Sequence, residues 1–420
     1  MLRTTLACLT FAALVAGGCG DRQRAAEGPY GREVADAIPQ VERFTRLKFK
    51  SPPKVEERST DQVREFVARQ YEEADAATRL AGEERALRLL GVIPDTMQLR
   101  PFVVDLLAEQ IIGYYDPKTK VLYIVKGADP AVASITVTHE LVHALQDQYV
   151  NLDSVNSANK DDSDRALAAH ALVEGQATYV QLQAQTGGTF DPERLGGWSG
   201  IRQLIRQNQA KIPKFSAAPM YVQETLLFPY LSGAELVRRE YVRDSTASVL
   251  ARFPVSTEQA MHATAFDTGD PDAPTSVTLP APRGATTVHE DVIGEFGARL
   301  FLYEHLHDQA AAIRGAAGWD GDRYMVVRTP RGDGLVWLTI WDQALDAGEF
   351  ADIVKQGINR RFGGPRETKV AGGSEFAAGA RVVRVTGGEI AGRVYVLYVD
   401  VPAGVSRDVI DLAAVRLRSP

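Results

Sequence analysis

The chain has 420 residues, of which 45% are hydrophobic and 24% are charged, and its formal net charge is −7. Such a composition is typical of a folded globular protein, and the length suggests roughly two or three domains. The acidic net charge and the lack of a long basic run argue against nucleic acid as a partner. After the N-terminus no apolar run reaches about 18 residues, so the sequence predicts no transmembrane helix.

Residues 1–19 have the pattern of an export signal peptide. Arg3 provides a positive start, and the apolar run from Leu6 to Ala16 has the length of a signal-peptide core. The run leads to Cys19, and this ending resembles a bacterial lipoprotein signal in which Cys19 becomes the lipidated first residue. Ala16 fits its position less well than leucine would, so cleavage without lipidation is the alternative. We expect an exported protein of the bacterial cell envelope, held to a membrane by its N-terminal lipid on the periplasmic or extracellular face.

The next part of the chain predicts scaffold helices. Residues 20–60 are polar and interrupted by prolines, which indicates a tether and an N-terminal segment with a helix near residues 32–47. Residues 60–90 carry apolar side chains near helical spacing, and a further helix is expected from Asp95 to about Gln110. None of these helices carries a chemical motif, so we interpret them as packing elements.

A β-hairpin is predicted directly after these helices. The apolar stretches Ile111–Tyr115 and Lys120–Val125 flank Asp116-Pro117-Lys118-Thr119, a sequence that favours a tight turn. A helix is then expected from Asp129, a good N-cap residue, because proline follows at the first helical position.

That helix contains the sequence His139-Glu140-Leu-Val-His143. Histidines four residues apart lie on one face of a helix, one turn above the other, so both imidazoles can bind one zinc ion. Glu140 stands beside the first histidine, where it can act as general base on a water held by the metal. Thiolate ligands are excluded, because the cysteines Cys8 and Cys19 both lie in the predicted signal.

Glu174 is the predicted third ligand. It lies in the middle of a second predicted helix, which begins near Ser163 or Asp164 and ends at the glycine pair 187–188. Its neighbours are small and apolar, and a buried carboxylate needs a partner such as a metal cation. Gly175 beside it would allow another backbone to approach closely. Two histidines and one glutamate leave a coordination position for water, which is typical of catalytic zinc.

With these residues in place, the chain resembles the glutamate-ligand zinc metallopeptidases, or gluzincins. The sequence from His139 to Asp147 is similar to the zinc helix of the thermolysin family, and the resemblance covers roughly residues 110–182. The sequence around Glu174 also resembles bacterial secreted or lipid-anchored proteins of this broad class whose substrates are unclear. The resemblance implies one zinc ion and a peptide or protein substrate. Thr178 departs from it, because the family has at that position an aspartate that orients the first histidine, so this support must differ here.

The resemblance also implies where substrate would lie. In zinc peptidases a strand just before the metal helix commonly forms the edge along which an extended peptide binds. Val121–Val125 is the candidate strand here, and an ordinary interior strand is the open alternative. His170, one turn before Glu174, is either a group that supports the ligands, a competing ligand, or a histidine with no role in the site.

His262 is the predicted donor that stabilises the oxyanion of the transition state. It follows the ligands in the chain, at the end of a short helix that begins with a capping box at Ser256 and Gln259. A surface histidine without this role is the alternative, and Tyr179, Tyr221 and Tyr230 are the next candidates.

The fold class predicted from these elements is α+β. Residues 61–310 are expected to form a mainly helical, zincin-like catalytic region with the β-hairpin before its metal helix. Residues 320–420 show strand alternation interrupted by two helical stretches, Phe350–Phe362 and Ser406–Arg418, which predicts a C-terminal ββαββα unit. The predicted function is a zinc-dependent metallopeptidase, and the alternative is a non-catalytic peptide- or envelope-binding lipoprotein that retains the fold.

Overall fold

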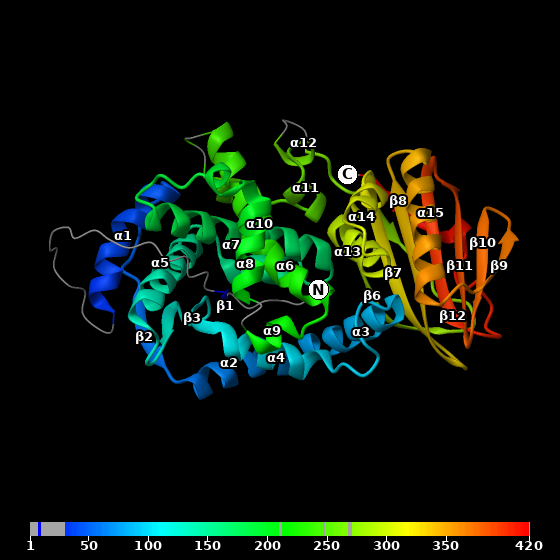
Figure 1. The fold of residues 1–420 in the computed structure, drawn as a ribbon, viewed down its shortest axis with the longest axis horizontal. Coiled ribbons are helices and arrows are strands. Elements are labelled where there is room, and N and C mark those ends of the chain that lie inside the picture. The colour runs from blue at the N-terminus through cyan, green and yellow to red at the C-terminus, as the bar shows by residue number, and fades with distance from the viewer. Residues whose placement is uncertain are drawn as a thin grey trace.

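The computed structural model of the chain describes residues 7–9, 30–209, 212–244, 246, 248–267 and 271–419. The fold is α+β: a mainly helical part lies beside a part that is built on one large sheet (Figure 1). Within the described ranges, no helix is long and apolar enough to cross a membrane.

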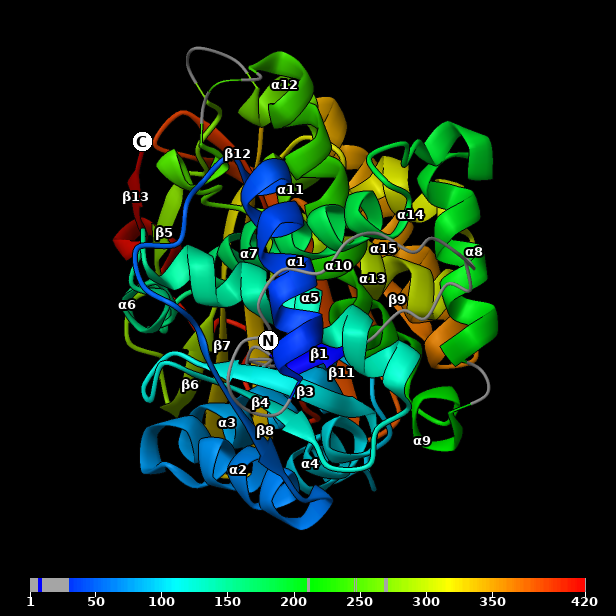
Figure 2. The ribbon, with the colours of Figure 1, turned by 90° about the vertical axis from the view of Figure 1, so that its left-hand side faces the viewer.

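The helical part extends from the N-terminal side of the chain to about residue 267. Its α-helices are α1 (Gly31–Thr45), α2 (Thr60–Glu72), α3 (Ala74–Leu90), α4 (Leu99–Gln110), α5 (Pro130–Asp147), α6 (Leu152–Ala158), α7 (Ser163–Gln185), α8 (Gly197–Gln209), α9 (Pro213–Ser216), α10 (Met220–Arg243), α11 (Thr257–Met261) and α12 (Ala263–Phe266). Figure 2 shows α1 lying across α5, and apolar side chains of both helices share one buried cluster. Helix α1 continues through Pro39 without a break. The N-cap of α4 is Gln98, three residues after the cap predicted at Asp95.

A small sheet lies beside α5. Its strands are β1 (Ala7–Leu9), β2 (Lys54–Arg58), β3 (Ile111–Asp116) and β4 (Val121–Val125), in the order β1-β3-β4-β2. The predicted hairpin is confirmed, because β3 pairs with β4 in antiparallel register. The prediction that β4 receives an extended peptide is wrong, because β2 already pairs with its other edge. The open alternative, an interior strand, is what the structure shows.

Helices α7 and α10 cross closely, and two glycines make this possible. A Cβ atom added at Gly175 would lie 2.1 Å from the backbone carbon of Gly233, and one added at Gly233 would lie 1.9 Å from the Ala171 oxygen. No real Cβ atom tolerates such contacts with backbone. The expectation from the sequence that Gly175 permits a close backbone approach is confirmed. Because Glu174 precedes this crossing, the crossing fixes the position of its carboxylate.

We expect Gly175→Ala to lower the free energy of unfolding by about 3 kcal/mol, because the added methyl group must push two packed helices apart. Gly348→Ala is the matched control, since Gly348 lies in a helix with open space around its Cβ position. That substitution should instead stabilise the chain, by up to about 1 kcal/mol, through helix propensity. Denaturant unfolding of both variants measures the two effects, and equal stabilities would contradict the crossing argument.

The C-terminal part is built on a seven-stranded antiparallel sheet in the order β6-β7-β8-β12-β11-β10-β9. Its strands and the helices beside them are β6 (Thr286–Asp291), α13 (Gly294–Leu306), α14 (Gln309–Ala316), β7 (Trp319–Thr329), β8 (Gly332–Trp341), α15 (Ala344–Arg361), β9 (Arg366–Val370), β10 (Gly373–Ala378), β11 (Arg381–Ile390) and β12 (Arg393–Pro402). Alternate residues along the strands face opposite sides. Trp337, for example, packs with Phe350 of α15, whereas Val336 and Leu338 face away.

The predicted helix at Ser406–Arg418 is wrong. That segment contains only a short 3₁₀ turn (Leu412–Ala414) and the strand β13 (Arg416–Arg418), which pairs with β5 (Ser276–Thr278). Val409, Ile410 and Val415 are buried in the cluster on the outer face of the large sheet. An extended segment covers that face, so its apolar residues do not need helical spacing.

Buried carboxylates connect the two parts. Asp164, in the first turn of α7, accepts hydrogen bonds from the backbone N–H and the hydroxyl of Thr257 at 3.1 and 2.5 Å, and the same hydroxyl accepts one of 3.1 Å from the N–H of Phe296 on α13. Asp291, the last residue of β6, accepts a hydrogen bond of 2.8 Å from the backbone N–H of Ser163, the first residue of α7. The start of the helix that carries Glu174 is therefore anchored at its contact with the sheet part.

Candidate metal centre

Helix α5 presents two buried imidazoles. Asp129 caps the helix by accepting hydrogen bonds from two N–H groups of the first turn, and Pro130 follows, as the sequence predicts. The rings of His139 and His143 lie one turn apart with their centroids 4.9 Å from each other. Both side chains are excluded from solvent, and apolar residues of the same helix pack against α1 and β4.

Helix α7 brings Glu174 to these imidazoles. Its Oε2 atom lies 3.1 Å from Nε2 of His139 and 3.4 Å from Nε2 of His143. One ligand atom from each of the three residues lies within 4.8 Å of the others, which is close enough for one ion. In the described part of the chain no other group of histidine, cysteine and acidic residues meets this condition. The three residues predicted as ligands therefore form a buried cluster that could hold a metal ion.

Electrostatics in the cluster favour a cation. Burial opposes the ionisation of Glu174, but the neighbouring imidazoles, that of His143 above all, hold its pKa well below the ordinary value. Burial also lowers the pKa of His143, yet the carboxylate of Glu174 outweighs this effect and raises that pKa to about 9. The carboxylate of Glu174 thus favours a positive charge beside it, which either a proton on His143 or a bound cation can supply.

One buried atom of the cluster, Nε2 of His143, has no hydrogen-bond partner among the described residues, and Oε1 of Glu174 has beside it only the Nε2 atom of His170 at 3.2 Å. Unpaired polar atoms inside a protein are costly, and they are expected where an ion or a water belongs. Two imidazole nitrogens and one carboxylate oxygen are also the donor types that zinc prefers at catalytic sites. The residues present therefore fit a zinc ion.

Glu140 lies beside the cluster with one oxygen engaged and one unpaired. Its Oε2 atom accepts a hydrogen bond of 2.8 Å from the backbone N–H of Tyr115 in β3, which holds the side chain in place. Its Oε1 atom is buried and lacks a partner in the described structure. Burial raises the pKa of this carboxyl group. Glu140 is thus a fixed carboxylate with one oxygen available to accept a proton.

Two glutamine side chains contact the Nδ1 atoms of the two histidines. The Oε1 atom of Gln181 lies 3.0 Å from Nδ1 of His139, and the Oε1 atom of Gln146 lies 2.8 Å from Nδ1 of His143. Sequence reasoning missed both, although Thr178 already indicated that the support of the first histidine must differ from that of the resembling family. The available signal was spacing, since Gln146 is one turn after His143 and Gln181 two turns after Glu174.

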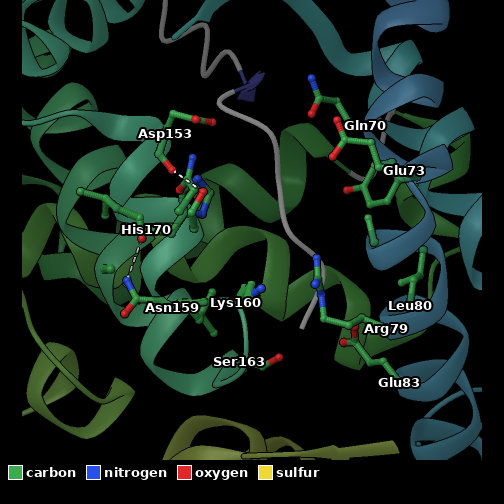
Figure 3. Close-up of a pocket in the computed structure, with 18 of the residues that line it drawn as sticks. Gln70, Glu73, Arg79, Leu80, Glu83, Asp153, Asn159, Lys160, Ser163 and His170 are labelled. Atoms are coloured by element: carbon green, nitrogen blue, oxygen red, sulfur yellow. Dashed lines mark hydrogen bonds between the residues drawn. The ribbon is translucent and has the colours of Figure 1, made fainter. Parts of the chain in front are cut away.

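A cavity of about 300 Å³ lies next to the cluster, between the α2–α3 segment and the α6–α7 segment (Figure 3). His170 lines this cavity, and its Nε2 atom lies 3.2 Å from Oε1 of Glu174. It therefore contacts the oxygen of Glu174 that the other two histidines do not approach. Polar and charged side chains of both signs project from the two walls, among them Gln70, Glu73, Arg79, Asp153, Asn159 and Lys160.

The structure does not bring His262 into this centre. Its Nε2 atom lies 2.8 and 3.0 Å from the two carboxylate oxygens of Glu295 on α13. The structure therefore gives its predicted oxyanion role no support.

Tyr230 is the alternative candidate beside the cluster, with its ring centroid 6.3 Å from that of His139. The ring of Tyr179 packs instead on Tyr241.

Comparisons with known proteins concern another part of the chain. Residues 283–401 match a family model described as a domain of unknown function, DUF8575, and this match covers the large sheet but not the metal cluster. No curated protein and no solved structure gives a significant match.

Proposed function

We propose that this protein is a zinc-dependent hydrolase, and that within this class it is a metallopeptidase. The observation that carries the proposal is the combination at one buried site of a His-His-Glu ligand set and a separate carboxylate with an unpaired oxygen. A structural zinc site needs no such extra carboxylate, and it is usually closed by four protein ligands. His139, His143 and Glu174 leave a coordination position for water.

In this proposal the residues of the chain have distinct roles. Zinc at the three ligands would lower the pKa of a coordinated water to about 7 and polarise the scissile carbonyl group. Glu140 would accept a proton from the attacking water through Oε1 and return it to the leaving amine. The hydrogen bond from Tyr115 keeps the other oxygen of Glu140 engaged, so the carboxylate does not rotate away.

The proposed substrate is a peptide or protein in extended conformation. The candidate strand for such a chain is β3, whose outer edge is covered only by the short strand β1, whereas β4 lies between β3 and β2. In the structure β1 pairs with this edge in antiparallel register, and β1 lies within the predicted signal peptide, so its removal would leave the edge of β3 open to a substrate strand. Strand β3 also donates the hydrogen bond to Glu140, so a peptide bound there would run beside the proposed base. Side chains of the substrate would enter the cavity lined by His170.

Metal analysis and a peptide-library digest test the proposal together. The purified chain should contain about one zinc ion, and it should cleave peptides in a reaction that a chelator stops and added zinc restores. A chain that binds no metal would overturn the zinc assignment. A chain that binds zinc but cleaves no peptide or protein would favour the non-catalytic binding function instead.

We also propose that the mature protein is lipid-anchored at Cys19, which lies outside the residues that the structure describes. A Cys19→Ser variant should then leave the membrane fraction or remain uncleaved, because lipoprotein maturation requires the thiol. Membrane fractionation and the electrophoretic mobility of wild type and variant measure this. Unchanged distribution and mobility would mean that no lipid is attached there.

A further inference from the structure

The two imidazoles of the metal centre are held by neutral amides. Gln146 and Gln181 are both buried, and each places its Oε1 atom at the Nδ1 atom of one histidine. Histidine ligands generally donate their second ring N–H to a carboxylate, a backbone carbonyl or water, and this bond fixes the tautomer and the ring orientation. Here side-chain amides occupy that place at both histidines.

The direction of the Gln146 amide follows from its other contacts. Its Nε2 atom lies 2.9 Å from the backbone oxygen of Val173 and 2.9 Å from Oε1 of Gln176. A backbone carbonyl can only accept a hydrogen bond, so the atom facing Val173 must be the NH₂ group. The oxygen of Gln146 therefore faces Nδ1 of His143, which must carry hydrogen. Nε2 is then the nitrogen of His143 left to bind a metal ion, and it is the atom that lacks a hydrogen-bond partner in the described cluster.

This arrangement spans three helices. Gln146 lies on α5, Gln176 on α7, and the Nε2 atom of Gln176 donates to the hydroxyl of Tyr241 on α10 at 2.8 Å. The guanidinium of Arg46 covers the ring of Tyr241 at 4.2 Å from its centroid. The orientation of the His143 ring is therefore determined by the packing of the whole helical part and not by one neighbour.

Gln181 differs from Gln146. Its oxygen contacts His139, but its Nε2 atom is buried and has no hydrogen-bond partner among the described residues. Nothing else therefore requires an NH₂ group at this position. A carboxylate could replace the Gln181 amide and still accept from His139, whereas a carboxylate at Gln146 would direct an oxygen at the Val173 carbonyl.

We propose that Gln146 and Gln181 are positioning residues of the metal centre, which hold both Nδ1–H groups and thereby direct both Nε2 lone pairs to the ion. The inference rests on the metal site of the proposed function, but it does not depend on the reaction or on the substrate. It also explains how the site functions with Thr178 at the position where the resembling family has an aspartate.

The test is metal affinity, measured with Zn²⁺ and Co²⁺ by competition with a chromophoric chelator on the full chain. Gln146→Leu and Gln181→Leu keep the approximate volume and remove the acceptor, and each should weaken binding about 10–100-fold. Gln183→Leu is the control. Gln183 is a buried glutamine on α7, the helix of Gln181, but its amide donates to the hydroxyl of Tyr179 and the backbone oxygen of Phe190 and not to a histidine. Its metal affinity should equal that of the wild type.

The two glutamate variants separate positioning from simple packing. Gln181→Glu should bind metal at least as tightly as the wild type, because a carboxylate accepts the His139 hydrogen more strongly. Gln146→Glu should bind at least about tenfold more weakly, because its second oxygen meets a carbonyl that has no hydrogen to give. Loss of a merely structural side chain would not produce opposite signs at the two positions.

The outcomes are distinguishable. Wild-type affinity in both leucine variants would overturn this inference and leave the proposed function intact. A wild-type chain that binds no metal would overturn both. Where Gln146→Leu does not fold, as judged by circular dichroism, the two Gln181 variants decide, since the hydrogen bond to His139 is the one that the Gln181 amide makes in the described structure.

Discussion

Glu140→Gln is expected to keep the metal and the fold but to lower the hydrolysis rate by about 10³–10⁴-fold, near the upper limit for a general base. The amide oxygen of glutamine can still accept the hydrogen bond from the Tyr115 N–H, so the side chain should remain in place. Its NH₂ group would then occupy the position of Oε1, the unpaired atom that has to accept the proton. An amide cannot do so, and the chemical step should fail.

Three measurements make this result interpretable: zinc content, the unfolding midpoint, and turnover on a peptide that the wild type cleaves. Glu109→Gln is a suitable control, because it removes the same charge from an exposed position on α4. Turnover near the wild-type value in Glu140→Gln would show that another group is the base. Loss of zinc in that variant would mean that Glu140 contributes to binding, and the assignment of roles would need revision.

The three residues of the candidate metal cluster were predictable from the sequence because their signals are local. The spacing of His139 and His143 on one helix is a matter of helical geometry, and the cap at Asp129 marks where that helix begins. Glu174 could be inferred because a carboxylate in an apolar helix needs a partner. The structure confirms the helix and the cluster, and it adds the close crossing at Gly175 that holds the third residue in position.

The features that sequence reasoning missed depend on pairing between distant segments. Whether β4 is an edge strand depends on β2. That strand lies more than sixty residues earlier, and its residues are mostly charged. The amide at Gln146 is visible as a spacing, but its direction depends on Val173 in another helix. His262 follows the ligands in the chain, yet chain order does not show that Glu295 takes its ring nitrogen.

Glu174→Ala is expected to have the second large effect, a loss of metal affinity of about 10³-fold or more. The substitution removes one of three ligands and also the negative charge that a divalent cation needs inside a buried site. His139 and His143 remain on α5, but two neutral imidazoles do not complete a catalytic zinc site. Hydrolysis should fall in parallel, and excess zinc should restore it only in part.

Glu174→Gln distinguishes the loss of a ligand from the loss of structure. Glutamine keeps the volume of the side chain beside the Gly175 crossing, and its amide can still contact the ring of His170, so the fold should be retained. Because a neutral amide is a poor zinc ligand, this variant should also lose most of the metal. Zinc per chain after dialysis, measured with the unfolding midpoint, gives the answer. Full occupancy in either variant would show that the ion lies elsewhere, and the cluster would then be a buried ion-pair network of the core.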